Sequence, residues 1–270
     1  MKKNVAITVL ASVLALSSKN IFATPVISDS FTDPNGALIG QSSQIGTGSW
    51  TITGASVVNP IQVSSGLVPL ANNGQDVYDQ FSSAVSTTSG GSIFAGLDLD
   101  VTAAQTTGDY FLHFCSVAGA TSGFYDKVWA KSSGAGFVLG SQDNNGTVTY
   151  GSTVLTLGTT YRLVTEEDFV SGALNDTFKF YVNPTDLSVA ANNTTYLTAT
   201  WSGTTAEAST YAEVNFRQGS SSAAPTETVD NLIVGTAFSD VSPAPTPEPS
   251  TIALLTLGGV AGLAAIRRKR

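Results

Sequence analysis

The stretch Tyr110-Phe-Leu-His-Phe-Cys-Ser-Val117 sets the expectation for the fold. It is a short run of aromatic and apolar residues, and its side chains alternate in the way that is typical of a β-strand. Because successive strand residues point to opposite faces, one face of this strand is expected to carry Phe111, His113, Cys115 and Val117.

Similar β-branched and aromatic runs recur along the chain, separated by clusters of Gly, Asn and Ser. Within residues 24–240, no window of a dozen residues shows the apolar period of a helix. We therefore predict an all-β, two-sheet antiparallel sandwich of the jelly-roll type. The predicted strands are Ser49–Val58, Gln62–Ser64, Ser92–Val101, Tyr110–Ala118, Gly136–Ser141, Thr147–Tyr150, Thr160–Glu166, Thr177–Val182, Ala212–Gln218 and Val229–Gly235.

Two segments between these strands carry turn signals. Asn144-Asn-Gly146 suits a hairpin with a primed turn, in which the central residues adopt positive φ. Ser171-Gly-Ala-Leu-Asn-Asp176 is expected to form a second hairpin loop.

Short landmarks recur in the body: Asp29-Ser-Phe31, Gly36-Ala-Leu-Ile-Gly-Gln41, Trp50-Thr51, Phe178-Lys-Phe-Tyr-Val-Asn-Pro184 and Asp230-Asn-Leu-Ile-Val-Gly-Thr236. They resemble those of concanavalin-A-like, or laminin-G-like, jelly rolls of exported bacterial proteins. The resemblance implies that the first strand lies beside the last and that Asn183-Pro184 ends a strand, since proline cannot continue a ladder. Because many activities use this fold, the resemblance implies no particular function.

The C-terminal segment has three parts. Residues 241–249 form a proline-rich linker, which favours extended backbone. Residues 250–270 hold an uncharged apolar run, near the shortest length that crosses a hydrocarbon core of about 30 Å, and therefore predict a single transmembrane helix. Four cations follow this run and would be held on the cytoplasmic side: Arg267, Arg268, Lys269 and Arg270.

This tail resembles the PEP-CTERM sorting signal of exopolysaccharide-producing Gram-negative bacteria. The residues that carry the resemblance are Pro247, Glu248 and Pro249, the apolar run and the terminal cations. The resemblance implies that an exosortase cleaves the chain near Pro-Glu-Pro. It also implies an inner-membrane-tethered precursor, delivered afterwards to the cell surface or to an extracellular biofilm matrix.

The N-terminus predicts export as well. Residues 1–23 combine basic Lys2 and Lys3 with an apolar stretch, and they end at Ala23, where we expect a signal peptidase to cut. Basic residues thus flank both apolar segments on the same side of the membrane. The body, residues 24–240, is predicted to be one domain on the other side.

The composition of the body excludes some partners. It holds five Lys or Arg against 19 Asp or Glu, a net charge of −14, so nucleic acid is not expected to bind. Cys115 is the single cysteine, which rules out an intrachain disulfide, and it is expected to be buried. His113, the single histidine, is expected to make a structural hydrogen bond, and no soft-metal site can be assembled.

No catalytic site is predicted. Laminarinase-type hydrolases share the jelly roll and carry Glu-x-Asp-x-x-Glu on one strand, where the carboxylates share a face. The nearest stretch here is Glu166-Glu167-Asp168, in which Glu167 points away from the other two and no third acid follows at the required spacing. We expect a solvated strand end and a protein that is not an enzyme, with a glycoside hydrolase or lyase of another pattern as the least favoured alternative.

A calcium site is a minor hypothesis. Asp98 and Asp100 alternate with apolar residues, so both carboxylates would face one side of a strand, and hard cations bind such oxygens. The segment from Gln142 to Gly146 is a second oxygen-rich turn. The alternative in both cases is an ordinary polar exterior or an Asx turn.

Aromatic residues offer candidates for glycan contact. Trp129, Trp201 and Tyr125 are the principal ones, and Trp129 lies in a segment that mixes rings with an acid and two cations. A position in the core remains the alternative for each tryptophan, and Trp50 is expected to be in the core. Two roles stay open: a non-catalytic structural or adhesive surface protein, or a lectin-like module that binds exopolysaccharide.

Overall fold

The computed structural model describes residues 25–88 and 90–241. This part of the chain forms strands β1 to β16 and two 3-10 helices, η1 (Ala190–Asn192) and η2 (Phe238–Val241). No helix among the described residues is long and apolar enough to span a membrane. The predicted signal peptide, linker and C-terminal helix lie outside the described residues, apart from Val241.

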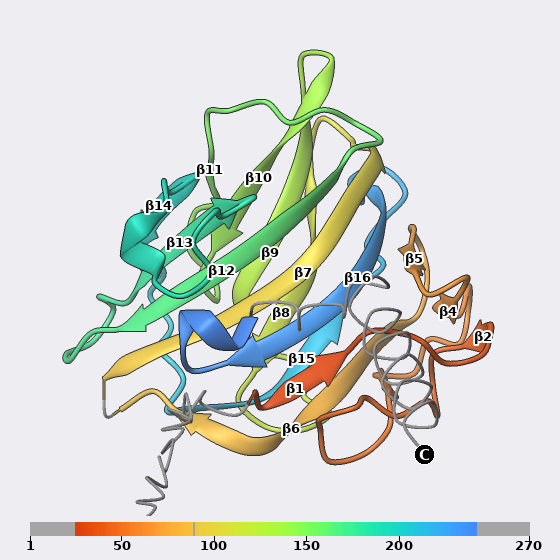
Figure 1. Ribbon diagram of the computed structural model, residues 1–270, viewed down its shortest axis with the longest axis horizontal. Helices are drawn as coiled ribbons and strands as arrows, with labels where there is room; N and C mark the ends of the chain where they lie inside the picture. The colour runs from red at the N-terminus through yellow and green to blue at the C-terminus, as the bar shows by residue number, and fades with distance from the viewer. Residues whose placement is uncertain (1–24, 89, 242–270) are drawn as a thin grey trace, which may run out of the picture.

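Two seven-stranded antiparallel sheets overlie one another (Figure 1). We call them sheet I and sheet II. The strand order in sheet I is β1 (Ile27–Asp29), β16 (Thr226–Gly235), β7 (Gly91–Ala103), β12 (Thr160–Phe169), β13 (Thr177–Val182) and β14 (Leu197–Thr200), and β5 (Val68–Leu70) also pairs with β16. The order in sheet II is β11 (Thr149–Tyr150), β10 (Gly136–Gln142), β9 (Phe124–Ser133), β8 (Asp109–Cys115), β15 (Thr210–Phe216), β6 (Asp76–Ser86) and β3 (Thr51–Thr53). A small pair is formed by β2 (Gly36–Ala37) and β4 (Gln62–Val63).

The predicted all-β jelly-roll sandwich is confirmed. The first strand lies beside the last, with Ile27 opposite Val234 and Asp29 opposite Leu232. Strand β13 ends at Val182, and the following Asn183 takes a positive φ of 49°. Both predicted hairpin connections also join antiparallel neighbours, β10 to β11 and β12 to β13.

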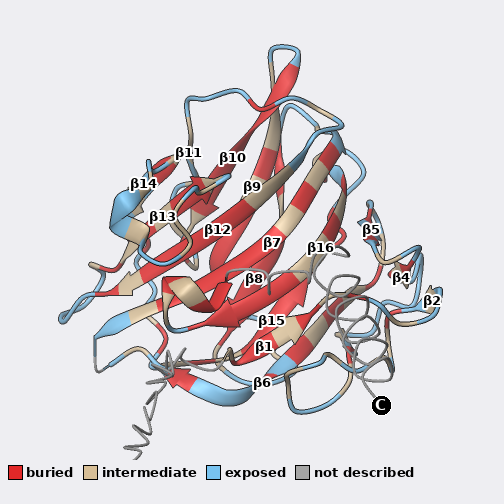
Figure 2. Cartoon of the chain, viewed as in Figure 1, coloured by how far each residue is buried: buried red, intermediate tan, exposed pale blue. Residues whose placement is uncertain are grey.

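The core fills the space between the two sheets, and their central strands are buried over most of their length (Figure 2). Trp50 is 1% exposed and stacks on Phe216 with 5.0 Å between ring centroids, which confirms its predicted place. Cys115 is buried, as predicted. The core is aromatic, and such rings bury large apolar areas, so this core needs no disulfide.

Several local predictions are wrong. Strands β6 and β9 were not among the predicted strands, because β6 is rich in Asp, Gln and Ser and β9 contains Asp126, whose φ of 43° breaks the alternation. The strand expected over Ser49–Val58 extends only over Thr51–Thr53. None of the residues Asn144-Asn-Gly146 has positive φ, so the turn is not of the primed type.

The face predicted for the opening stretch is wrong as well. Pairing between β8 and β9 shifts register between Tyr110 and Phe114, so Phe111 joins the core cluster and His113 does not. Val117 is 61% exposed. His113 is buried, and neither of its ring nitrogens has a hydrogen-bond partner among the described residues, contrary to expectation.

Candidate functional site

Three rings lie in one row across sheet II, on the face turned away from the core. Tyr110 of β8 is directly opposite Trp129 of β9, and the two ring centroids are 5.5 Å apart. Trp129 is opposite Gly140 of β10, and Gly140 is opposite Tyr150 of β11. The core cluster contains none of these three rings, and each is half-buried. We call Tyr150, Trp129 and Tyr110 the aromatic row.

Two glycines make room for Tyr150. A Cβ atom on Gly140 would lie 2.6 Å from Cδ1 of Tyr150, so a side chain here would displace the ring. Gly108 has a φ of +73°, and a Cβ there would lie 3.0 Å from the Tyr150 hydroxyl oxygen. The Tyr150 ring therefore lies against the backbone of β10 and extends toward Gly108.

Cations lie over two of the rings. The Arg217 guanidinium is 4.2 Å from the centroid of the Tyr110 ring, and Lys127 Nζ is 5.2 Å from it. Lys131 Nζ is 3.8 Å from the centroid of the Tyr150 ring. The electron-rich ring faces attract these cations and hold them beside the aromatic row.

The three cations differ in their other partners. Arg217 pairs with Asp109 at 2.7 Å and lies 4.0 Å from Asp76. Lys127 donates to the carbonyl of Asn144 at 2.5 Å and to the side chain of Gln142 at 3.3 Å. Among the described residues, no carboxylate lies within ion-pair range of Lys131.

The two tyrosine hydroxyls of the aromatic row stay protonated near neutral pH. Burial raises the pKa of Tyr110 to about 12 and that of Tyr150 to about 12, so both side chains stay neutral hydrogen-bond donors near pH 7. His113 lies 5.4 Å from the Tyr110 ring, between centroids. Its burial, and then the charges of Lys127 and Arg217, hold its pKa well below the usual value, so the imidazole is neutral.

The other two aromatic candidates are in the core. Trp201 is 6% exposed and Tyr125 is 8% exposed, and their ring centroids are 6.2 Å apart. Both belong to the core cluster, because Trp201 packs beside Phe178 of sheet I and Tyr125 beside Tyr211 of sheet II. Trp201 therefore lies in the core, the alternative given for it above. The prediction that Trp201 and Tyr125 contact a glycan is corrected, because both rings are buried. Trp129 is the one candidate of the three that lies on the outer face.

The C-terminus matches a family model described as the PEP-CTERM protein-sorting motif, over residues 245–270. This chain carries a PEP-CTERM sorting motif. The motif implies processing by an exosortase and export by way of a membrane-anchored precursor. The residues expected to take part, Pro247, Glu248, Pro249 and the cations from Arg267 to Arg270, lie outside the described residues, as does Ala23.

Comparison with curated protein sequences gave no match for the PEP-CTERM chain. Among solved structures, it is similar to the W1238A mutant of HCR/D, with a TM-score of 0.48, 9% identity and 81% of this chain covered. The chain spans about half of that protein, 51%. It is also similar to domain 4 of AbnA, an extracellular arabinanase of Geobacillus stearothermophilus solved with arabinotriose, with a TM-score of 0.43, 14% identity, and 81% and 98% of the two chains covered.

A third similar structure is the CBM2 module of the evolved Dit protein of Lactobacillus casei BL23 phage J-1. Its TM-score is 0.43 and its identity 12%, with 80% of this chain and 96% of that chain covered. At such scores and identities, nothing about the role of the PEP-CTERM chain follows from these three proteins.

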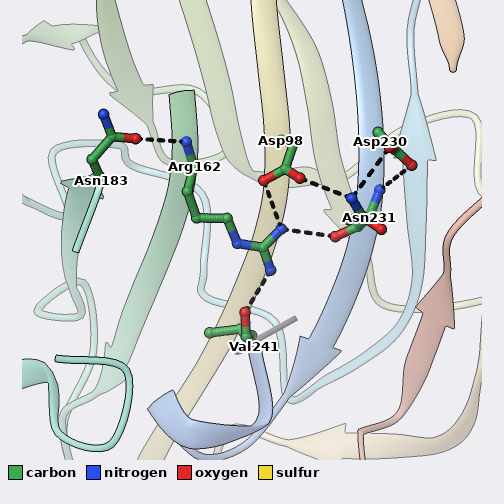
Figure 3. Close-up of polar contacts among 6 residues, drawn as sticks. All are labelled: Asp98, Arg162, Asn183, Asp230, Asn231 and Val241. Atoms are coloured by element: carbon green, nitrogen blue, oxygen red, sulfur yellow. Dashed lines mark hydrogen bonds and ion pairs between the residues drawn. The ribbon is translucent and has the colours of Figure 1, made fainter. Parts of the chain in front are cut away.

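The predicted calcium ligands lie on sheet I of the PEP-CTERM chain, away from the aromatic row. Asp98 accepts hydrogen bonds from Arg162 at 3.3 Å and from Asn231 at 2.8 Å, so its charge is already compensated (Figure 3). No group of three or more His, Cys, Asp or Glu side chains that could hold a metal ion occurs among the described residues. Calcium at Asp98 and Asp100 stays a prediction.

The second oxygen-rich turn has a structural use. The Asp143 carboxylate accepts N–H groups of Gly146 at 2.5 Å, of Gly203 at 2.8 Å and of Ser202. It thereby fastens the turn after β10 to the segment that follows Trp201.

The acidic stretch on β12 is not the solvated strand end that was expected. Glu166 and Asp168 share one face, as predicted, and both pair with Lys179. Glu167 points the other way and is fully buried, where it accepts a hydrogen bond from the Tyr211 hydroxyl at 3.0 Å. The strand continues to Phe169, so these acids lie within the sheet.

The sequence analysis missed most of this site. It singled out Trp129 but not Tyr110, Tyr150 or Gly140. The available signal was the meander of consecutive strands β8 to β11, which brings these residues side by side once the registers are known.

Proposed function

We propose that this PEP-CTERM protein is a non-catalytic adhesive module of the cell surface or extracellular matrix, and that it binds exopolysaccharide through the aromatic row. The observation that carries this proposal is the line of three half-buried rings on the outer face of sheet II. Export as an exosortase substrate would bring that face into contact with surface glycans.

Aromatic rings held in this way suit carbohydrate. Trp129 offers an apolar surface on which the C–H groups of a sugar can pack, and Tyr110 and Tyr150 beside it each carry a neutral hydroxyl donor. The rings are held by the sheet beneath them and by the cations over them, so little side-chain entropy is lost when a ligand binds. All three side chains are partly exposed, which leaves room for contact.

The state of the carboxylates favours a non-catalytic role. Glu166 and Asp168 share Lys179 between them, and the Tyr181 hydroxyl donates to Glu166 at 2.5 Å. Near the aromatic row, Asp109 and Asp76 are both beside Arg217. A glycosidase needs one free carboxylate and one proton donor on either side of the scissile bond. The carboxylates named here are engaged in ion pairs with Lys179 and Arg217 instead.

Affinity electrophoresis tests the proposal. The full-length chain, in neutral detergent, is run through native gels that each contain dextran, mixed-linkage β-glucan or polygalacturonate. We expect at least one polysaccharide to retard the wild type, and Trp129→Ala to weaken that retardation about 5- to 10-fold. Tyr78→Ala is the matched control, because Tyr78 is a half-buried tyrosine of β6 in the same sheet, outside the aromatic row.

Retardation of the Tyr78→Ala variant should equal that of the wild type. If none of the three polysaccharides retards the wild type, or if Trp129→Ala behaves as the wild type does, the row is not a glycan site and a purely structural role remains.

The proposed location has its own test. Mass spectrometry of the protein recovered from the outside of a Gram-negative host should find an N-terminus directly after Ala23 and a C-terminus near Pro247-Glu248-Pro249. An intact chain in the cytosol would contradict the proposed route.

A further inference from the structure

The cations of the body are unevenly distributed. Of the five Lys and Arg between residues 25 and 241, three lie beside the aromatic row: Lys127, Lys131 and Arg217. The same part of the chain holds 19 acids. An acidic polymer would be repelled by most of this surface, and the aromatic row is the place where the repulsion is locally offset.

Within this group, Lys131 is the cation that lacks a charge partner. Arg217 faces Asp109 and Asp76, so its charge is largely compensated. Lys127 is 9% exposed and donates to two oxygens of the neighbouring turn. Lys131 is half-buried, its Nζ lies over the Tyr150 ring, and no described carboxylate is in ion-pair range.

We infer that the ligand of the aromatic row is an acidic polysaccharide, and that Lys131 selects it by pairing with a carboxylate of the sugar. This inference rests on the proposed function. A sugar ring stacked on Trp129 would place its acid group within reach of the Lys131 ammonium, because Lys131 is two residues along the same strand and on the same face. The hydroxyl of Tyr150, whose ring lies under the Lys131 ammonium, stays protonated and can donate to the same group.

The position of Lys131 favours selectivity over bulk affinity. Its ammonium is held at 3.8 Å over a ring, so it is pre-positioned and loses little freedom on pairing. An exposed ion pair is weak and is screened by salt, so the stacked sugar would supply most of the affinity. A neutral polymer of the same backbone would keep the stacking and lose the pair.

The test compares polygalacturonate with its fully methyl-esterified form, which has the same backbone without the charge. The full-length chain in neutral detergent is run through gels containing either polymer, at low and at high salt. We expect the acid form to retard the wild type about 3- to 5-fold more strongly than the ester, and the difference to vanish at about 0.5 M salt.

Two substitutions complete the test. Lys131→Gln should bring the retardation by polygalacturonate down to that by the ester, and should leave the retardation by the ester unchanged. Lys179→Gln, on sheet I, is the matched control and should retain the wild-type preference. Circular dichroism and thermal unfolding of each variant show whether its fold is retained.

The outcomes separate the two proposals. Equal retardation by the acid and the ester, sensitive to Trp129→Ala but not to Lys131→Gln, would overturn the selection of acidic sugars and leave glycan binding in place. Retardation by dextran or β-glucan but not by polygalacturonate would likewise overturn the selection of acidic sugars and leave glycan binding in place. Absence of retardation by every polymer would overturn both.

Discussion

The hydroxyl of Tyr211, in sheet II, donates a 3.0 Å hydrogen bond to Oε1 of Glu167, in sheet I, across the core of the sandwich. Both side chains are buried, with 1% and 0% exposure. Asp126 contributes a second fully buried carboxyl group, whose negative charge would raise the pKa of Glu167 further, and neither Asp126 oxygen has a hydrogen-bond partner among the described residues. Burial raises the pKa of Glu167 well above its usual value and that of Asp126 to about 7.

The first prediction concerns the pH dependence of stability. Both groups hold their proton in the folded state and lose it near pH 4 in the unfolded state, so stability is greatest below that pH and falls as pH rises toward 7 and beyond. Urea unfolding of Asp126→Asn at pH 4, 5, 6 and 7 should show a flatter pH dependence than the wild type, by up to about 1.4 kcal/mol per pH unit.

The control is Asp186→Asn, because Asp186 is partly exposed and hydrogen bonds from Asn192 and Ser188 lower its pKa to about 2. It should leave the slope above pH 4 unchanged. An unaltered slope in Asp126→Asn would mean that Asp126 is ionised in the folded protein.

The second prediction isolates the hydrogen bond between the sheets. Tyr211→Phe removes the donor and leaves Oε1 of Glu167 buried without a partner, so the free energy of unfolding should fall by about 1–3 kcal/mol. Tyr161→Phe removes a hydroxyl that accepts the N–H of exposed Thr156 at 2.9 Å, where water can replace it, and should change stability by less than about 0.5 kcal/mol. If urea unfolding shows that Tyr211→Phe and Tyr161→Phe lower the free energy of unfolding equally, the hydrogen bond across the core adds no more stability than a surface hydrogen bond.

The third prediction concerns Arg162, which joins three strands of sheet I to the end of the body. It donates to Asp98, to the carbonyl of Asn231 at 2.9 Å and to the carbonyl of Val241 at 2.5 Å (Figure 3). Arg162→Met should lower the free energy of unfolding by roughly 2 kcal/mol, less than for a fully buried pair because the Asp98 side chain is 28% exposed.

Adding Asp98→Asn to Arg162→Met should restore part of that loss, since it removes the uncompensated charge. A double-mutant cycle in urea measures this coupling. If the effects of the two substitutions on the free energy of unfolding are additive, Asp98 and Arg162 do not stabilise each other, which would contradict the prediction.

The fourth prediction concerns the glycine beneath the aromatic row. Gly140→Ala places a Cβ against the Tyr150 ring and should displace it, weakening polysaccharide retardation and altering the near-UV circular dichroism. Gly48→Ala is the control, because no described residue beyond its two chain neighbours has an atom within 4 Å of the Cβ that it would add. If Gly140→Ala has the polysaccharide retardation and the near-UV circular dichroism of the wild type, the position of the Tyr150 ring does not matter for binding.

The sequence predicted the architecture better than the site. Alternating runs and turn residues were enough for an all-β sandwich, for the burial of Trp50 and for the pairing of the first strand with the last. These features depend on local pattern and on landmarks that stand in the sequence itself.

The aromatic row depends on register instead. Tyr110, Trp129 and Tyr150 lie far apart in the sequence, and they line up only because each hairpin of the meander pairs at a particular offset. Pairing between β8 and β9 shifts register twice between Tyr110 and Phe114, once beside Asp126, and nothing in the alternation predicts these shifts. The placement of Trp201 was not predictable either. A tryptophan at a strand end can face either the solvent or the core, and the sequence does not distinguish these two orientations.

The central claim is that the aromatic row binds glycan, and fluorine NMR of the full-length chain labelled with 5-fluorotryptophan tests it most directly. The chain has three tryptophans, and Trp50 and Trp201 lie in the core, so the signals can be assigned with Trp129→Phe. On titration with fragments of a polysaccharide that retards the chain in gels, we predict that the Trp129 signal shifts while the other two stay in place. A Trp129 signal that does not move at saturating glycan, or a shift confined to Trp50 or Trp201, would contradict the account.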